Sequence, residues 1–329
     1  MKRRVSNHTE SWASLIPFRI ANHQWNEYPS VVCEIEQDGL VGWGEALGVY
    51  YRDETEQSML RQLESISAEL AAGANRSELL ELLPAGGARN AADAALWDLE
   101  AQIKDTSVWE LAGVATNHVE TVFTIGLEDE PDDMAAGAAA ASGLSLLKIK
   151  LNNDRPVERI AAIRAARPDA RLVVDVNQGW TFGELQHYAP AMQALGVQMI
   201  EQPLPRGADA ELQNYRSPVP LCADESCLHL GELDQAAGRY QLINIKLDKT
   251  GGLTQALELA TAVKAKGLGI MVGSMCGSSL AMAPHHVVAQ LADLADIDGP
   301  LLMKSDRPGG LIYKHGMVSL PARRFWGRR

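Results

Sequence analysis

Apolar and polar positions alternate in a characteristic way over the first third of the chain. Apolar or alternating stretches predict three strands, at 12–21, 30–36 and 40–45. Gln37-Asp38-Gly39 supplies a hairpin turn between the last two strands. Helical periodicity predicts two helices, at about 54–71 and 90–104, with Pro84-Ala85-Gly86-Gly87 between them. The pattern is typical of an antiparallel sheet packed against helices, an α+β unit.

After residue 119 the pattern changes to short apolar strands that alternate with amphipathic helices. We expect strands at 119–126, 144–151, 172–176, 197–202, 220–223, 242–247, 269–273 and, more weakly, 291–296. Their spacing is typical of parallel strands joined by crossover helices, and eight such strands favour a closed barrel. An open doubly wound sheet is the alternative, although no Gly-x-Gly-x-x-Gly follows the first strand. From about residue 311 the pattern is irregular and basic, and we expect this tail to pack on the first domain.

The composition excludes several classes of partner. The 329 residues carry a formal net charge of -12, whereas nucleic acids and anionic membranes attract a basic face. No apolar run reaches the length of a membrane span, and residues 1–11 lack the apolar core of a secretory signal. The four cysteines form no Cys-x-x-Cys pair, which is typical of free thiols in a reducing compartment. We therefore expect a cytoplasmic protein with a small-molecule substrate and no nucleic-acid or membrane partner. The sequence leaves open whether the protein forms a homo-oligomer.

Lys148 and Lys150 interrupt the apolar run of 144–151. Side chains alternate along a strand, so both lysines point to one face and Ile149 points to the other. Two buried ammonium groups repel each other and lose hydration unless anions or a substrate lie opposite. The alternative is an edge strand with two solvated lysines.

Three carboxylates, Asp175, Glu201 and Asp224, follow at the ends of successive predicted strands. In a βα barrel these strand ends share one face, where their side chains converge. Carboxylates brought together repel unless a cation holds them, and ligation by oxygen alone suits Mg²⁺. The alternative is three carboxylates that separately cap nearby helix N-termini.

Lys246 lies on the sixth predicted strand, across the mouth of the barrel from Lys150 on the second. Two lysines that face each other across a metal-bound ligand can act as an acid–base pair on opposite faces of one carbon. A lysine serves as a base only if its pKa falls, and we expect nearby cations such as Lys148 to lower it.

Taken together, these residues resemble the motifs of the enolase superfamily, in the branch of the muconate-lactonising enzymes. The motifs are Lys148-x-Lys150, Asp175-x-Asn177, Glu201-Gln202-Pro203, Asp224-Glu225-Ser226, and Lys246 within Asn-Ile-Lys-Leu-Asp-Lys-Thr-Gly-Gly. The similarity covers nearly the whole chain, including Val41-Gly42-Trp43-Gly44-Glu45-Ala46. It implies an α/β fold: an N-terminal α+β capping domain (1–115), a (β/α)7β TIM-type barrel (116–308), and a C-terminal tail (309–329) that completes the capping domain.

The resemblance also implies roles for these residues. Asp175, Glu201 and Asp224 would hold one Mg²⁺ per subunit. Lys150 and Lys246 would be the two acid/base catalysts, and Lys148 would neutralise the substrate carboxylate. Asn177 and Glu225 would orient the metal ligands.

Asp296-Ile297-Asp298, after the eighth predicted strand, resembles the Asp-x-Asp motif with which dipeptide epimerases hold the α-ammonium group of their substrate. A solvated loop is the alternative. Ser274 would line the pocket from the seventh strand. The resemblance thus implies a Mg²⁺-dependent dipeptide epimerase, in which one lysine removes the α-proton of the C-terminal residue and the other reprotonates the resulting enediolate on its opposite face.

Two loops would select the side chains of the substrate. In relatives that act on L-Ala-D/L-Glu, an arginine between the first two strands meets the glutamate side chain, but residues 20–28 contain none at that place. His23, Trp25 and Tyr28 suggest an apolar or aromatic side chain, and Glu27 would tolerate a cation. Arg52, in the second loop, would instead suit an acidic side chain.

Other readings remain open for this site. Racemisation of N-acylated amino acids and the β-elimination of o-succinylbenzoate synthase would use the same residues, but their substrates lack the free ammonium group that Asp-x-Asp recognises. A catalytically silent protein on this fold is the alternative from another class. If the sixth strand continues beyond Lys246, we expect Lys249 to point to the other face. We expect His285-His286 to pack within a helix or to face solvent.

Overall fold

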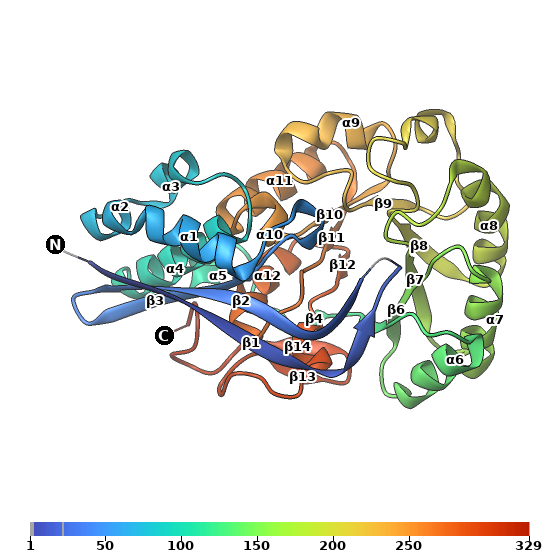
Figure 1. The fold of residues 1–329 in the computed structure, drawn as a ribbon, viewed down its shortest axis with the longest axis horizontal. Coiled ribbons are helices and arrows are strands. Elements are labelled where there is room, and N and C mark those ends of the chain that lie inside the picture. Colours follow the sequence, from blue (N-terminus) through green and yellow to red (C-terminus); the bar gives the residue numbers. More distant parts are fainter. Residues whose placement is uncertain (1–2, 22, 329) are drawn as a thin grey trace.

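The computed structural model describes residues 3–21 and 23–328, so Asn22 of the first loop lies outside the described residues. The chain opens with an antiparallel sheet of β1 (Arg4–Arg19), β2 (Gln24–Gln37) and β3 (Leu40–Leu47) in that order (Figure 1). The sequence predicts all three strands, but β1 begins well before residue 12. Residues 4–11 alternate between exposed and partly buried positions, so pairing with β2 forms this part of β1 without a buried apolar face.

Five helices follow this sheet: α1 (Glu56–Ser65), α2 (Ser67–Ala72), α3 (Arg76–Leu82), α4 (Gly87–Ile103) and α5 (Val108–Leu111). The helix predicted at 54–71 divides at Ile66, and α3 was not predicted, although Asn75 and Glu78 form a capping box at its start. The helix α4 packs closely on β3 because two positions of β3 lack a side chain. A Cβ atom at Gly42 would lie 2.2 Å from the Ala95 carbonyl oxygen, and one at Gly44 would lie 2.3 Å from that of Ala91.

The rest of the chain forms a curled parallel sheet of eight strands that follow one another in chain order. They are β5 (Phe123–Ile125), β6 (Leu146–Lys150), β7 (Arg171–Asp175), β8 (Val197–Glu201), β9 (Leu221–Ala223), β10 (Leu242–Ile245), β11 (Gly269–Val272) and β12 (Leu294–Ala295). The strand predicted at 119–126 is in fact two. Its first part, β4 (Val119–Glu120), pairs with the C-terminal tail instead.

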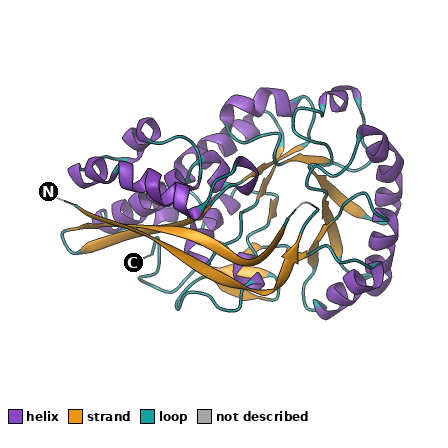
Figure 2. Cartoon of the chain, viewed as in Figure 1, coloured by secondary structure: helices purple, strands orange, loops and turns teal. Residues whose placement is uncertain are grey.

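Helices cover the outer face of this curled sheet (Figure 2). They are α6 (Pro131–Ala140), α7 (Pro156–Ala166), α8 (Phe182–Ala194), α9 (Leu233–Ala237), α11 (Leu253–Ala265) and α12 (Ser279–Ala289). The short helix α10 (Leu247–Thr250) follows the end of β10 and packs on α4 and α11. Short 3₁₀ turns are η1 (Tyr50–Arg52), η2 (Ala210–Asn214), η3 (Leu230–Glu232) and η4 (Gly299–Leu302). Among the residues described, no helix is long and apolar enough to span a membrane.

The two faces of β6 belong to different cores. Leu147 and Ile149 pack in the large core beneath the helices. Leu146 packs with Val173 and Met199 in a separate cluster on the inner face of the sheet. Because side chains alternate, Lys148 and Lys150 share this inner face with Leu146.

The C-terminal tail contacts both β4 and α4. Its strands β13 (Ile312–Lys314) and β14 (Met317–Ser319) form a small sheet with β4. Beyond them, Trp326 Nε1 donates to the Ala94 carbonyl at 3.1 Å, and the Gly327 N–H donates to Asp98 Oδ1 at 2.8 Å. These two residues are therefore held on α4.

Candidate active site

The lysines of β6 lie inside the protein. β6 pairs with β5 on one side and β7 on the other, so the edge-strand alternative is wrong. Lys148 is 1% exposed and Lys150 is 8% exposed. Lys150 Nζ donates to Asp175 Oδ2 at 2.6 Å, and Lys148 Nζ lies 3.0 Å from the same oxygen. The repulsion between the two ammonium groups is thus offset by a shared carboxylate.

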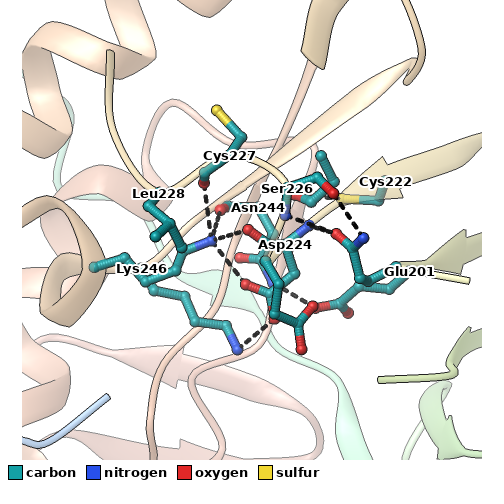
Figure 3. A network of polar contacts seen from close by, with 12 residues as sticks. Glu201, Cys222, Asp224, Ser226, Cys227, Leu228, Asn244 and Lys246 are labelled. Atoms are coloured by element: carbon teal, nitrogen blue, oxygen red, sulfur yellow. Dashed lines mark hydrogen bonds and ion pairs between the residues drawn. The ribbon is translucent and has the colours of Figure 1, made fainter. Parts of the chain in front are cut away.

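The three predicted metal ligands each have one oxygen fixed by a protein donor. These donors are the Asn177 N–H for Asp175 Oδ1 (3.0 Å), Asn244 Nδ2 for Glu201 Oε1 (2.6 Å) and Lys249 Nζ for Asp224 Oδ1 (2.7 Å). Figure 3 shows two of these carboxylates, with Glu201 next to Asn244 and Asp224 next to the ammonium group of Lys246. The carboxylates are buried and held together, so they do not cap separate helices as the alternative reading required.

The second oxygens of two of these carboxylates, Glu201 and Asp224, are less well satisfied. Lys148 Nζ lies 2.7 Å from Glu201 Oε2, and Lys246 Nζ lies 2.8 Å from Asp224 Oδ2. Neither contact has hydrogen-bond geometry, so both oxygens are buried without a hydrogen-bond donor and are held by charge alone. Such oxygens suit a small divalent cation.

Within the described residues, no three His, Cys, Asp or Glu side chains are arranged around a common point as they would be around a metal ion. Lys148 contacts both Asp175 and Glu201, so its ammonium group takes up their facing oxygens. The carboxylate set nevertheless fits Mg²⁺, because it offers oxygen donors alone and two of them lack a hydrogen-bond partner.

The pKa of Lys246 is raised, whereas the sequence analysis expects it to be lowered. Burial lowers the pKa of this lysine, but the carboxylates of Asp224 and Glu201 outweigh burial and raise the pKa above its usual value. For Asp175, burial favours protonation, yet Lys148 and Lys150 lower its pKa. Lysine and carboxylate therefore stabilise each other's charged forms. A cation bound to the carboxylates would compete for them and would lower the pKa of Lys246 toward that of a base.

One cavity of about 610 Å³ brings together most of the predicted site residues. It is lined by Lys150, Lys246, Asp224, Asn177, Glu225, Ser274, Asp296, Asp298, His23 and Trp25, among others. Lys148, Asp175 and Glu201 are buried behind this wall. Arg52 does not line the cavity: it lies in η1 and its Nη1 donates to the Ala85 carbonyl at 3.4 Å. None of the lining residues in the described chain is an arginine.

Asp296 and Asp298 are buried beyond the end of β12, so the solvated-loop alternative is wrong. Lys148 Nζ donates to Asp296 Oδ2 at 2.7 Å, and the Thr124 N–H donates to Asp298 Oδ2 at 2.7 Å. Burial, and then the neighbouring Asp296, raise the pKa of Asp298. Asp296 is thus paired with an ammonium group, whereas Asp298 accepts from a backbone N–H, and a buried acid of this kind is suited to receive a cationic group.

The rings of the two loops form a cluster at the cavity. The His23 and Trp25 rings lie 4.2 Å apart, and the Tyr50 ring meets that of Trp25 edge to face at 5.1 Å. The Tyr28 side chain is buried, and its hydroxyl lies 3.3 Å from Ser14 Oγ. Both loops named in the sequence analysis thus contribute to the wall.

The prediction for Lys249 was wrong. β10 ends at Ile245 and α10 begins at Leu247, so strand alternation does not extend from Lys246 to Lys249. Lys249 instead turns back, and its Nζ donates to Asp224 Oδ1 and to the carbonyls of Asp224 and Asn244.

Asn244 was also missed, although it stands two residues before Lys246 and shares its face of the strand. His285 and His286 are buried within α12, which is one of the two alternatives expected for them.

Comparison with known proteins identifies the family. Residues 2–113 match the family model of the mandelate racemase / muconate lactonizing enzyme N-terminal domain, and residues 132–324 match the enolase C-terminal domain-like family. The chain belongs to the enolase superfamily.

Individual relatives are similar over nearly their full length. The chain is 41% identical to the L-Ala-D/L-Glu epimerase of Escherichia coli over 97% of this chain and 100% of that protein. It is 40% identical to an N-acetyl-D-glutamate racemase of Pseudoalteromonas sp, over 90% of this chain and 95% of that one. Among solved structures, an Agrobacterium tumefaciens enolase family member with bound sodium and L-Ala-L-Glu has a TM-score of 0.96 at 41% identity, covering 99% of this chain and 100% of its own.

Proposed function

We propose that this protein is a Mg²⁺-dependent dipeptide epimerase that inverts the α-carbon of the C-terminal residue. The observation that carries the proposal is the placement of Lys150 and Lys246, which come from β6 and the end of β10 and line one cavity. Each contacts a different carboxylate, Asp175 or Asp224. The similarity to the epimerase of Escherichia coli supports the same activity.

In this proposal the two lysines act on opposite faces of the α-carbon. One removes the α-proton and holds it on Nζ, while the other donates a proton from its own Nζ to the opposite face. Lys148, behind the cavity wall, neutralises the substrate carboxylate. Asp296 and Asp298 receive the α-ammonium group of the dipeptide by charge-assisted hydrogen bonds.

Asp175, Glu201 and Asp224 would hold the Mg²⁺ ion, with Asn177, Asn244 and Lys249 fixing their orientation. When bound, the ion supplies positive charge that stabilises negative charge developing on the substrate carboxylate. Glu225 lines the cavity with both carboxylate oxygens buried and without a hydrogen-bond donor, and it would help to orient the residues that hold the ion.

The proposal extends to the finer architecture. We propose a closed (β/α)7β barrel, supported by the hydrogen bond of 2.9 Å from the Val122 N–H, just before β5, to the Ala295 carbonyl of β12. The domain limits 1–115, 116–308 and 309–329, and any homo-oligomer, stay predictions that limited proteolysis and light scattering would check.

The direct test is incubation in D₂O with Mg²⁺ and either L-Ala-L-Glu or a pooled set of L,L-dipeptides. Gain of one deuteron, together with the appearance of the L,D product, would support the proposal. A protein that exchanges no dipeptide α-proton, yet exchanges that of an N-acylated amino acid, would contradict it.

Racemisation of an N-acylated amino acid is the second candidate, favoured by the similarity to the N-acetyl-D-glutamate racemase. Such a substrate has no ammonium group for Asp298. Asp298→Asn should therefore raise KM for a dipeptide by about tenfold or more, since a charge-assisted hydrogen bond contributes about 1.5–3 kcal/mol. The same substitution should leave turnover of N-acetylglutamate within about threefold if that compound is the natural substrate.

A further inference from the structure

The helix α4 of the capping domain holds the chain segment that follows Lys246. Asn90 Nδ2 donates to Asp248 Oδ1 at 2.9 Å. Arg89 donates through Nη2 to the Thr250 carbonyl at 2.6 Å and through Nε to the Gly251 carbonyl at 3.0 Å. Arg89 and Asn90 are both buried, and neither lines the substrate cavity.

Two consecutive glycines allow α4 to come this close. Gly251 and Gly252 have φ of +76° and +122°, a region that favours glycine. A Cβ atom at Gly251 would lie 2.5 Å from Arg89 Nε, and one at Gly252 would lie 2.5 Å from Asp93 Oδ2. The Gly-Gly pair thus serves the contact with α4.

The helix α4 also fixes the start of α11. Asp93 accepts hydrogen bonds from the N–H and the hydroxyl of Thr254, at 2.9 and 2.6 Å. Trp97 Nε1 also donates to the Thr254 hydroxyl at 2.9 Å. Residues on one side of α4 therefore bind the polar groups of the segment from 248 to 254.

This segment is joined directly to Lys246. Lys246 is the N-cap residue of α10, and its carbonyl accepts hydrogen bonds of 3.0 Å from the N–H groups of Lys249 and Thr250. A helix of four residues is not stable by itself. The carbonyls of its last residue, Thr250, and of its C-cap, Gly251, accept from Arg89, so the contacts with α4 hold α10, which begins next to Lys246.

We propose that Arg89 and Asn90 are positioning residues for Lys246: by holding α10, they set where the Lys246 ammonium group reaches in the cavity. The proposal rests on the proposed function, in which Lys246 acts on one face of the substrate and Lys150 on the other. No corresponding hydrogen bond from α4 to β6 occurs among the described residues, so loosening these contacts should affect one lysine more than the other.

The two faces provide a specific test. In D₂O, the epimer whose α-proton faces Lys150 can exchange with retention through Lys150 alone, whereas inversion needs both lysines. In Asn90→Ala and Arg89→Lys, inversion should fall about tenfold or more, because misplacement by about 1 Å can cost that much or more. Exchange with retention of the Lys150-facing epimer should stay within about threefold of wild type. Lys246→Ala identifies which epimer this is.

The matched control is Gln102→Ala, on the exposed end of α4, whose side chain donates to the Val41 carbonyl. It should change neither rate. If all rates fall in parallel in Asn90→Ala or Arg89→Lys, the residues have only a structural role and the proposal is overturned. Should Asn90→Ala fail to fold, Asn90→Ser replaces it.

A second readout does not depend on turnover. Amide hydrogen exchange of the peptide 246–254, followed by mass spectrometry, should increase at least about tenfold in Asn90→Ala and Arg89→Lys but not in Gln102→Ala. Unchanged protection of this peptide in both variants would overturn the proposal even if wild type turns over no dipeptide. Absence of α-proton exchange in wild type, with protection lost in the variants, would reject the proposed function and leave the positioning of Lys246 supported.

Discussion

Lys249 Nζ donates a hydrogen bond to Asp224 Oδ1 at 2.7 Å, and both side chains are buried. The other oxygen of Asp224 faces the ammonium group of Lys246. Burial by itself would raise the pKa of Asp224, but Lys246 and Lys249 hold it well below its usual range. The contact with Lys249 behind this carboxylate thus leaves its second oxygen directed to the site.

Lys249→Met should weaken Mg²⁺ binding about 10- to 100-fold, because it removes the partner that orients a proposed ligand. It should also lower the free energy of unfolding by about 3–5 kcal/mol, since it leaves part of a buried ion pair unmatched. Isothermal titration with Mg²⁺ and urea denaturation measure the two effects. Lys264→Met, on the exposed end of α11, is the control. Wild-type affinity in Lys249→Met would show that Asp224 needs no such support.

Lys150→Ala and Lys246→Ala should each reduce inversion by about 10²- to 10⁴-fold or more, the range that a positioned acid or base contributes. Each variant should still exchange the α-proton of one epimer, and the two variants should act on opposite epimers. Nuclear magnetic resonance of the substrate in D₂O follows both processes. Lys304→Ala removes an exposed ammonium group and should behave as wild type. Loss of exchange with the same epimer in both variants would contradict action on opposite faces.

Removal of divalent cations with a chelator should abolish α-proton exchange, and added Mg²⁺ should restore it. The reason is that Glu201 Oε2 and Asp224 Oδ2 are buried without a hydrogen-bond donor and face the ammonium groups of Lys148 and Lys246. The fold should persist, because sheet hydrogen bonds and apolar cores hold it. Circular dichroism during chelation separates the two effects. Full activity after exhaustive chelation would contradict the metal requirement.

Asp98 should make stability depend on pH. Burial raises the pKa of this carboxyl to about 7, against hydrogen bonds from Gly327 and Trp43 that lower it. A raised pKa means that the folded state binds the proton more tightly than the unfolded state. This stabilisation is present in full below about pH 4 and is lost as the pH rises to about 7, a change of about 4 kcal/mol at most.

D98N removes this ionisation but keeps one acceptor oxygen. The melting temperature of wild type should therefore fall relative to that of D98N between pH 5 and pH 8. Asp132→Asn, at the exposed first turn of α6, should run parallel to wild type. Parallel curves for wild type and D98N would mean that Asp98 has an ordinary pKa.

The face of the sheet on which a strand residue lies could be predicted where the alternation of side chains along the strand alone decides it. The Lys148-x-Lys150 spacing fixed which side chains share a face of β6, and sheet pairing later placed Lys150 level with Asp175 and Glu201. Lys249 was misplaced because strand alternation was extended past Ile245, where the chain turns into α10. Side chains alternate between faces only within a strand, so this rule no longer predicts their direction once the chain enters a helix.

By itself, the sequence determined the succession of strands along the chain, the lysines that share one face of a strand and the carboxylates at the strand ends. These features follow from local periodicity. Only the tertiary structure decided which groups touch. It placed Arg52 outside the cavity, raised the pKa of Lys246 through carboxylates from other strands, and linked Asn90 to Asp248 across 158 positions of sequence. Distances between segments far apart in the chain depend on how helices and strands pack, and local patterns do not specify that packing.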